Sequence, residues 1–160
     1  MRRLVALALA TLVMGTTPAA AGRPPEPRCS AAEARGIVHH FVEAYNRGDV
    51  DYLDQLWAQE PEFFWYFDNA DPARRSPLLS EDRKTLTSYF TQRALLGDQL
   101  HLRKLSARWQ RGWHAAWGIS FELHRVSDQP EAEGIFHGKG AVTCGRRGSL
   151  LHAWAMGAAS

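Results

Sequence analysis

The sequence lacks most of the short motifs from which an activity can be read directly. It has no Gly-x-Ser-x-Gly element, and the stretch GIFHGKG has neither the spacing nor the Ser or Thr of a phosphate-binding loop. Its seven histidines include no H-x-H or H-x-x-x-H pair. The pattern therefore argues against a serine-nucleophile hydrolase, a nucleotide-phosphate site and a metal centre, and we expect no metal and no cofactor.

Cysteine is also scarce. Cys29 and Cys144 are too few and too far apart for a Cys-x-x-Cys redox motif or a zinc site built from several cysteines. In an oxidising compartment an isolated pair is usually a disulfide, and the alternative is two buried free thiols. A disulfide would tie the start of the domain to a strand near its end.

No apolar run is long enough to span a bilayer. The longest, Leu4 to Met14, follows Arg2 and Arg3 and precedes the small residues Ala19 to Ala21, which is the order of a secretory signal peptide. We therefore expect residues 1–21 to be removed, the protein to be secreted, and no membrane insertion afterwards. Loss of the two arginines lowers the formal charge from +2 to zero, so nothing indicates nucleic acid or an anionic membrane as a partner.

Residues 29–157 have the length of one ordinary domain and follow a short proline-rich lead, GRPPEPR, at 22–28. The domain opens with a capping box from Ser30 to Glu33, followed by apolar residues at helical spacing. This pattern predicts a helix that runs to about Arg47.

The tripeptide Arg47-Gly48-Asp49 could be a cell-adhesion signal or a turn between helices. Gly48 stands where a helix C-terminus favours positive φ, and Asp49 stands where the next helix needs an N-cap. A tripeptide held between two helices cannot readily form an extended adhesion loop, so we favour the turn.

The remaining elements change from helices to strands. Aromatic residues from Glu62 to Asp68 indicate a strand, and Ser80 is the expected N-cap of a third helix that Gly97 ends. After Gly97 the apolar period changes to two, which indicates strands. The four expected strands are 100–109, 113–126, 134–144 and 149–156. Helices followed by antiparallel hairpins predict an α+β domain.

The order of these elements resembles the nuclear transport factor 2-like superfamily, and within it the SnoaL-like proteins. The resemblance rests on FVEAYNRGDVDYLDQLW, the aromatic strand, the helix LTSYFTQR and the final strand LLHAWAMG, and it covers about Ser30 to Gly157. The two cysteine positions are similar to those of small secreted actinobacterial proteins.

This resemblance implies a cone: a strongly curved antiparallel sheet wrapped round a long N-terminal helix, with two further helices. SnoaL-like and related proteins include steroid isomerases, polyketide cyclases, dehydratases, epoxide hydrolases and proteins without catalysis. The fold alone therefore does not decide the function.

The catalytic positions of the steroid isomerases can be compared with this chain. The resemblance places their tyrosine at Phe41, their general-base aspartate at Trp65 and their acidic hydrogen-bond donor at Lys139. Phenylalanine has no proton to donate and tryptophan cannot abstract one, so that reaction is not expected.

The resemblance also implies which side chains face the interior of the cone. They would form mostly apolar walls with few polar groups, which describes either a small-molecule pocket or a filled core. The expected lining is Phe41, Trp65, Trp117, Ile119, Phe121, His137, Trp154 and Met156, with Lys139 and His152 beside them.

Three ionisable residues are candidates for catalysis. Lys139 could be a buried base or nucleophile, or could place its ammonium in water at the rim. His152 could transfer a proton near neutral pH, or could be a hydrogen-bonded core histidine. Asp68 could act at the mouth of the cone, or could shape the turn after its strand.

We therefore expect an exported binding domain of the SnoaL-like type, without catalysis, for a small apolar or amphipathic ligand or a protein partner. The alternative is a metal-free proton-transfer enzyme, an isomerase, cyclase or dehydratase, acting on a small apolar substrate. A third interpretation is a homodimeric interaction module, because SnoaL-like proteins often pair through the outer face of the sheet.

Overall fold

A computed structural model describes residues 28–59, 65–69, 78–111, 116–127, 133–145 and 148–158. The predicted signal peptide at 1–21 lies outside these residues, as do most of the proline-rich lead and the first residues of the strands expected from 62 and 113. No helix in the described part is long and apolar enough to cross a membrane.

The first two helices begin and end where the sequence indicates. The N-cap of α1 (Ala31–Arg47) is Ser30, and both halves of the predicted capping box are present. Gly48 follows with a φ of 64°, and Asp49 then caps α2 (Val50–Gln55). The predicted turn is confirmed: the Arg-Gly-Asp tripeptide is the junction between two helices.

The third helix begins later than predicted. The N-cap of α3 (Arg83–Leu95) is Asp82, whose carboxylate accepts a hydrogen bond from the Thr85 amide at 2.8 Å. Ser80 was the wrong residue, because it ends the short strand β2 (Leu78–Ser80), which the sequence did not indicate. Its hydroxyl donates to the carbonyl of Asp82 at 2.8 Å, while the carboxylate of Asp82 caps the helix.

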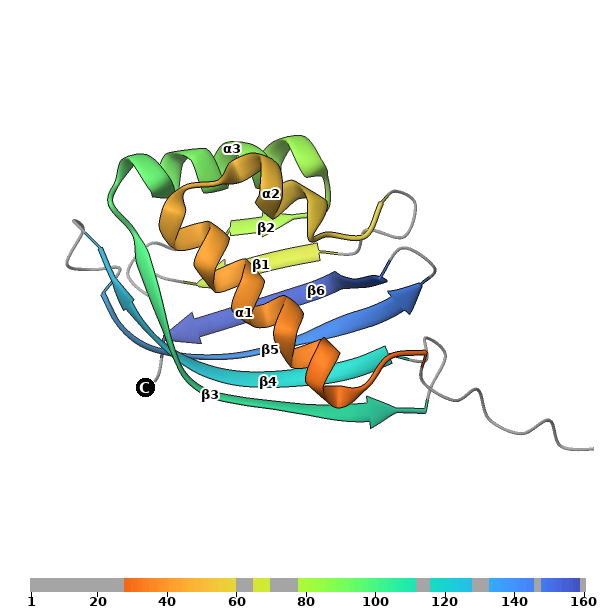
Figure 1. Cartoon of the computed structure of the whole chain (residues 1–160). Coiled ribbons are helices and arrows are strands. Elements are labelled where there is room, and N and C mark those ends of the chain that lie inside the picture. The colour runs from red at the N-terminus through yellow and green to blue at the C-terminus, as the bar shows by residue number, and fades with distance from the viewer. Residues whose placement is uncertain are drawn as a thin grey trace, which may run out of the picture.

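Within the described residues, six strands form one curved sheet in the order β2-β1-β6-β5-β4-β3. Besides β2 they are β1 (Trp65–Asn69), β3 (Gln99–Gln110), β4 (Ala116–Val126), β5 (Gly134–Gly145) and β6 (Gly148–Ala158). Strands β3 to β6 form the predicted antiparallel meander, and β1 adds in parallel to β6. In Figure 1, α1 crosses the concave face of the sheet while α2 and α3 lie near β1 and β2, which is the predicted α+β cone.

Aromatic rings fill the space between α1 and the sheet. The rings of Phe121 and Trp154 stack with centroids 4.0 Å apart, and the ring of Phe41 on α1 lies 4.6 Å from that of Trp154. Trp57 and Phe90 make edge contacts with Phe41, Tyr66 makes edge contacts with both of them, and all three are buried. Offset and edge-on packing of this kind is favourable beyond the apolar area that it buries.

Two glycines of β5 make room for the stacked rings. Gly138 pairs with Phe121 on one side and Met156 on the other, and Gly140 pairs with Trp154. A Cβ atom at Gly138 would lie 2.0 Å from the Phe121 ring, and one at Gly140 would lie 2.4 Å from a main-chain oxygen of β6. The sheet can carry two large rings here because β5 contributes no side chain at either position.

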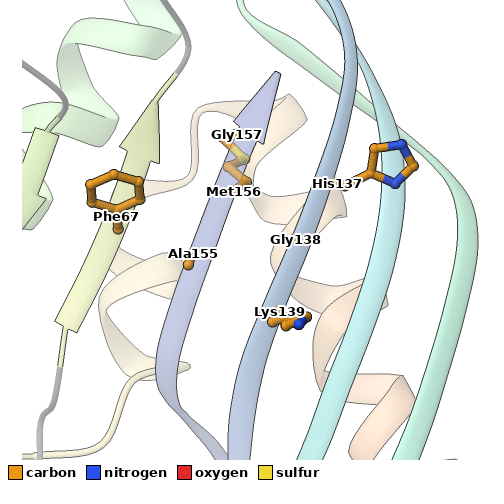
Figure 2. A pocket seen from close by; sticks show the side chains of 7 residues that line it. All are labelled: Phe67, His137, Gly138, Lys139, Ala155, Met156 and Gly157. Atoms are coloured by element: carbon orange, nitrogen blue, oxygen red, sulfur yellow. The ribbon is translucent and has the colours of Figure 1, made fainter. Parts of the chain in front are cut away.

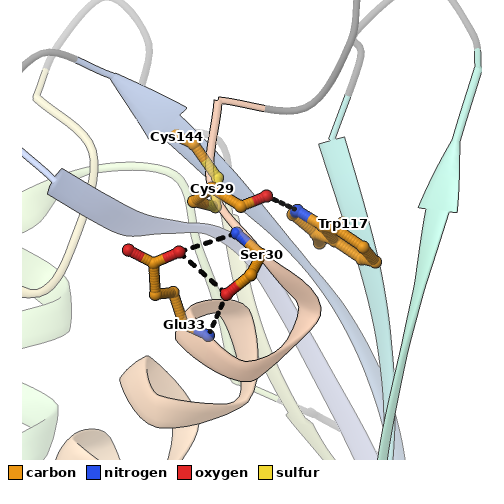
Figure 3. Close-up of a disulfide and its surroundings, with 5 residues drawn as sticks. All are labelled: Cys29, Ser30, Glu33, Trp117 and Cys144. Atoms are coloured by element: carbon orange, nitrogen blue, oxygen red, sulfur yellow. Dashed lines mark hydrogen bonds between the residues drawn. A yellow bond between two sulfur atoms is a disulfide. The ribbon is translucent and has the colours of Figure 1, made fainter.

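The predicted disulfide between Cys29 and Cys144 is present (Figure 3). It joins the residue before the Ser30 cap to the end of β5, with the two Cα atoms 5.7 Å apart. The indole Nε1 of Trp117 donates a hydrogen bond to the carbonyl of Cys29 at 3.1 Å. The disulfide, the capping box and this hydrogen bond together hold the start of α1 against the sheet.

We predict that replacing Cys29 and Cys144 by serine lowers the free energy of unfolding by about 2–4 kcal/mol, because the unfolded chain gains the freedom of a large loop. Urea denaturation followed by tryptophan fluorescence measures the change. Dithiothreitol should bring the wild-type protein to the same midpoint and leave the double variant unaffected. Equal stability of the two proteins in the absence of reductant would contradict the prediction.

The close packing at β5 gives a second prediction. Gly138→Ala should lower the free energy of unfolding by about 1–3 kcal/mol, because the new methyl group overlaps the Phe121 ring. Gly145→Ala is the matched control on the same strand, since a Cβ atom there meets nothing within 4 Å. If thermal unfolding places both variants at the same midpoint, the interior is less tightly filled than we conclude.

Candidate functional site

A group of polar side chains is buried on the inner side of the sheet. Arg125 on β4 lies between Asp68 on β1 and Asp98, the residue before β3, and all three side chains are at most 1% exposed. Nη1 of Arg125 donates to Oδ2 of Asp68 at 2.9 Å, and Nε donates to Oδ2 of Asp98 at 3.1 Å. A third hydrogen bond runs from Nη2 to Asp98. We call this group, with the residues described next, the Arg125 cluster.

Two tyrosines and a second arginine complete the Arg125 cluster. The hydroxyl of Tyr45 on α1 donates to Asp98 at 3.0 Å, and the hydroxyl of Tyr89 on α3 donates to Asp68. Arg93 on α3 places its Nε 3.5 Å from Asp98 and its guanidinium 5.1 Å from the centre of the Tyr89 ring. The cluster thus connects α1, α3, β1 and β4.

The end of α3 positions Asp98. Gly97 adopts a φ of 65°, and the amide of Asp98 donates back to the carbonyl of Arg93 at 3.1 Å. This is the left-handed helix end that glycine favours, and it confirms Gly97 as the residue that ends the third helix. The chain therefore turns inward immediately before β3 and carries the carboxylate into the core.

The charges of the Arg125 cluster balance one another. Two carboxylates, Asp68 and Asp98, face two guanidinium groups, Arg125 and Arg93. Burial alone would lower the pKa of Arg125, but its hydrogen bond to Asp98 and the surrounding acidic groups outweigh burial and raise it. The guanidinium therefore stays charged, as a buried cation between two carboxylates should.

The tyrosines of the cluster act as hydrogen-bond donors. Burial, followed by the charge of Asp68, raises the pKa of Tyr89 above its ordinary value, and burial does the same for the pKa of Tyr45. Both hydroxyls therefore keep their protons at neutral pH. Asp68 accepts from Tyr89 and Arg125 through Oδ2 and is buried, so it is not an exposed base.

A shallow trough lies on the opposite, outer face of the sheet (Figure 2). Its volume is about 310 Å³, and it is lined by Phe67, His137, Gly138, Lys139, Ala155, Met156 and Gly157. Phe67, Ala155 and Lys139 are register partners on β1, β6 and β5, so they form one row across three adjacent strands. In Figure 2 the helices lie behind these strands, which places the trough on the side away from the aromatic core.

A second hollow of about 420 Å³ adjoins the trough and shares His137 with it. It lies over β3 and β4, where Lys104 and Glu122 form an ion pair at 2.7 Å. Ser106 and Ser120 are cross-strand partners in the same hollow. The residues that line this second hollow are more polar than those that line the trough.

The structure places two of the predicted interior residues outside the cone. Lys139 and His137 are exposed on the outer face, and the β5 positions that face the interior are Gly138 and Gly140. The comparison with the steroid isomerases shifted β5 by one residue. Such a shift moves every side chain of a strand to the other face of the sheet, so Lys139 was wrongly expected inside the cone. Lys139 is therefore neither a buried base nor a buried nucleophile.

The other predicted residues divide into three groups. Phe41, Ile119, Phe121, Trp154 and Met156 are buried inside the cone, where the rings pack on one another. Trp117 and His152 are half-buried, and Trp117 bonds to the main chain beside the disulfide. The main chain of Trp65 pairs with Ala153, but its side chain lies outside the described part.

Of the catalytic candidates, Asp68 alone belongs to a buried polar site. The sequence interpretation missed Arg125 and Tyr89, which bond to Asp68, and also Asp98 and Tyr45 in the same cluster. One signal was available: Arg125 falls on the inward-facing alternation of Ile119, Phe121 and Leu123 in β4. An arginine at such a position requires buried acidic partners. Among the described residues, no three His, Cys, Asp or Glu side chains are grouped so that they could hold a metal ion.

The Arg125 cluster predicts a large effect of one substitution. Arg125→Met should lower the free energy of unfolding by about 3–5 kcal/mol, because it leaves Asp68 buried without a counter-charge and Asp98 with Arg93 alone. Lys104→Met removes a cation from a surface pair instead and should barely move the urea midpoint. If Arg125→Met does not fold, Tyr45→Phe, which removes one hydrogen bond to Asp98, should still lower the midpoint. Unchanged midpoints for both cluster variants would contradict a structural role.

No protein-family model matches the sequence, and no curated protein matches it either. Solved structures share its fold. A candidate dehydratase of the NTF2-like family from Streptomyces avermitilis has a TM-score of 0.65 at 13% identity, over 81% of this chain and 96% of that chain. A candidate aromatic ring hydroxylase from Novosphingobium aromaticivorans has a TM-score of 0.60 at 10% identity, over 81% and 88% of the two chains.

A third similar structure is the yeast complex of the deubiquitinase Ubp3 with its cofactor Bre5, with a TM-score of 0.61 at 10% identity over 79% of this chain and 95% of that one. Identities this low establish the fold and leave the activity open, and the three proteins are named for different functions. The curved six-stranded sheet round a long helix, the three helices and these structural matches together show that the chain has the NTF2-like, cystatin-like cone fold.

Proposed function

We propose that this protein is an exported binding domain that takes a small ligand without transforming it. The observation that carries this proposal is the filled interior. In a cone that houses a reaction, the space between the helix and the sheet must admit a substrate, whereas here it holds the rings of Phe41, Phe121 and Trp154, each at most 4% exposed.

The interior polar groups support the same proposal. Catalytic acids and bases need a reacting group within hydrogen-bond reach. In the Arg125 cluster the carboxylates, guanidinium groups and hydroxyls are bonded to one another. The arrangement is that of a structural ion-pair network rather than of a site that awaits a substrate.

One observation favours a second candidate, a proton-transfer enzyme. Asp68 and Tyr89 form a carboxylate–hydroxyl pair inside the cone, and Oδ1 of Asp68 has no hydrogen-bond partner within the described part of the chain. A structurally similar protein is named as a candidate dehydratase. If the interior opened, this carboxylate would be the group to accept a proton.

The disulfide supports the export part of the proposal. Disulfides persist in oxidising compartments and are rare in the reducing cytosol, and this one joins the two cysteines of the chain. Export through the predicted signal peptide would give a secreted protein that begins at Gly22.

Incubation with the metabolites of the secreting culture tests the proposal. The secreted, disulfide-bonded protein is mixed with the small molecules of the medium, and the mixture is separated by ultrafiltration and examined by mass spectrometry over time. A binding domain should retain certain compounds with unchanged masses, and heat-denatured protein should retain none of them. The intact protein should have the mass of the chain from Gly22.

Either of two results would contradict the proposal. One is time-dependent conversion of a metabolite, such as the loss of water, that is abolished by Asp68→Asn; this would establish the enzyme instead. The other is the failure of the native protein to retain any compound above the denatured control.

A further inference from the structure

We propose that the trough on the outer face of the sheet is the binding site, and that its ligand is a small monocarboxylate with an apolar tail. This inference deepens the proposed binding function and rests on it. The carboxylate would contact Lys139, and the tail would lie on β6 against Phe67.

The floor of the trough is shaped for a flat or extended apolar group. Ala155 and Gly157 are the outward positions of β6, and Gly138 lies beside them on β5. Such small residues let a ligand approach the main chain of the sheet closely. Phe67 on β1 stands at one side of this floor and Lys139 on β5 at the other. The trough thus has an apolar wall facing a cationic one.

Lys139 is a cation without a partner in the described part of the chain. It makes no ion pair or hydrogen bond there, whereas Lys104 on the same face is paired with Glu122 at 2.7 Å. None of the described residues that line the trough is acidic, and His137 provides a second basic side chain at its edge. A single unpaired ammonium beside an apolar floor is complementary to one negative charge on an apolar molecule.

The charge of the outer face favours this ligand over a second copy of the chain. The charged side chains that β3, β4 and β5 present there are Arg103, Lys104, Arg108, Lys139 and Glu122, four positive and one negative. Pairing two copies face to face would bring these like charges together. The same excess of positive charge would attract an anionic ligand to this face.

The volume limits the size of the ligand. About 310 Å³ corresponds to about ten water molecules at roughly 30 Å³ each, so the trough suits a ligand with a similar number of non-hydrogen atoms. Octanoate and 3-phenylpropanoate are of this size. A steroid or a long polyketide would extend far beyond the trough.

The test is a titration of the purified disulfide-bonded protein with sodium octanoate and with octanol, followed by ¹⁵N–¹H correlation spectra. Octanoate should shift the amide signals of Phe67, Lys139 and Gly157 and leave the amide signal of Phe41 and the indole signal of Trp154 unchanged. Octanol has the same tail without the charge and should bind at the same place more weakly.

Three variants make the test specific. Lys139→Ala should weaken octanoate binding about fivefold, as expected for one exposed ion pair, and leave octanol binding unchanged. Lys104→Ala, on the same face but paired with Glu122, is the matched control and should change neither affinity. Ala155→Leu should abolish binding of both compounds, because the larger side chain fills the floor.

Each contrary outcome has a distinct meaning. Shifts confined to the interior residues Phe41 and Trp154 would overturn the trough while leaving a binding function intact. Equal effects of Lys139→Ala on octanoate and octanol would overturn the carboxylate assignment. Concentration-dependent broadening of the trough signals without any ligand would show that a second copy covers this face. A native protein that retains metabolites but whose spectrum neither probe changes would refute the ligand class alone.

Discussion

The stack of Phe121 on Trp154 is the contact on which the rest of the structure depends. It occupies the middle of the cone, the ring of Phe41 on α1 packs against it, and it is possible because β5 carries glycine at the two positions beneath the rings. A curved sheet round a helix can enclose either a ligand or its own side chains. In this chain the two glycines of β5 leave room for the stacked rings, so the cone encloses its own side chains.

The Arg125 cluster has a comparable structural role at the polar part of the core. One guanidinium connects Asp68 of β1 with Asp98 at the start of β3, and hydroxyls from α1 and α3 bond to the same carboxylates. Buried charges are costly unless each is paired, and here each carboxylate has a basic partner. The interior is occupied by rings and by this network, and the two hollows formed by described residues lie on the outer face of the sheet.

Local signals in the sequence were sufficient for most of the fold. Ser30 with Glu33, Gly48, Asp49 and Gly97 each act through the main chain within a few residues, and the structure confirms all of them. The prediction of Ser80 as the N-cap of α3 was wrong, because the carboxylate of Asp82, two residues later, caps this helix. Competition between neighbouring caps cannot be decided from residue types alone.

The candidate site was harder to predict, because it depends on contacts that are distant in sequence. Arg125 meets Asp68 across 57 positions, and no local pattern joins them. Lys139 was assigned to the wrong face because strand alternation has a period of two, so a shift of one residue exchanges interior and exterior. The trough itself arises from the register of β1, β6 and β5, and the parallel pairing of β1 was not expected from the sequence.

The cone is filled by its own side chains in the region of Phe41, Phe121 and Trp154. The most direct test is the structure of a crystal pressurised with xenon, because xenon enters dry apolar cavities without any polar recognition. We predict no xenon between Phe41, Phe121 and Trp154. A well-occupied xenon atom among those three rings would contradict this prediction and would return the interior of the cone to consideration as the binding site.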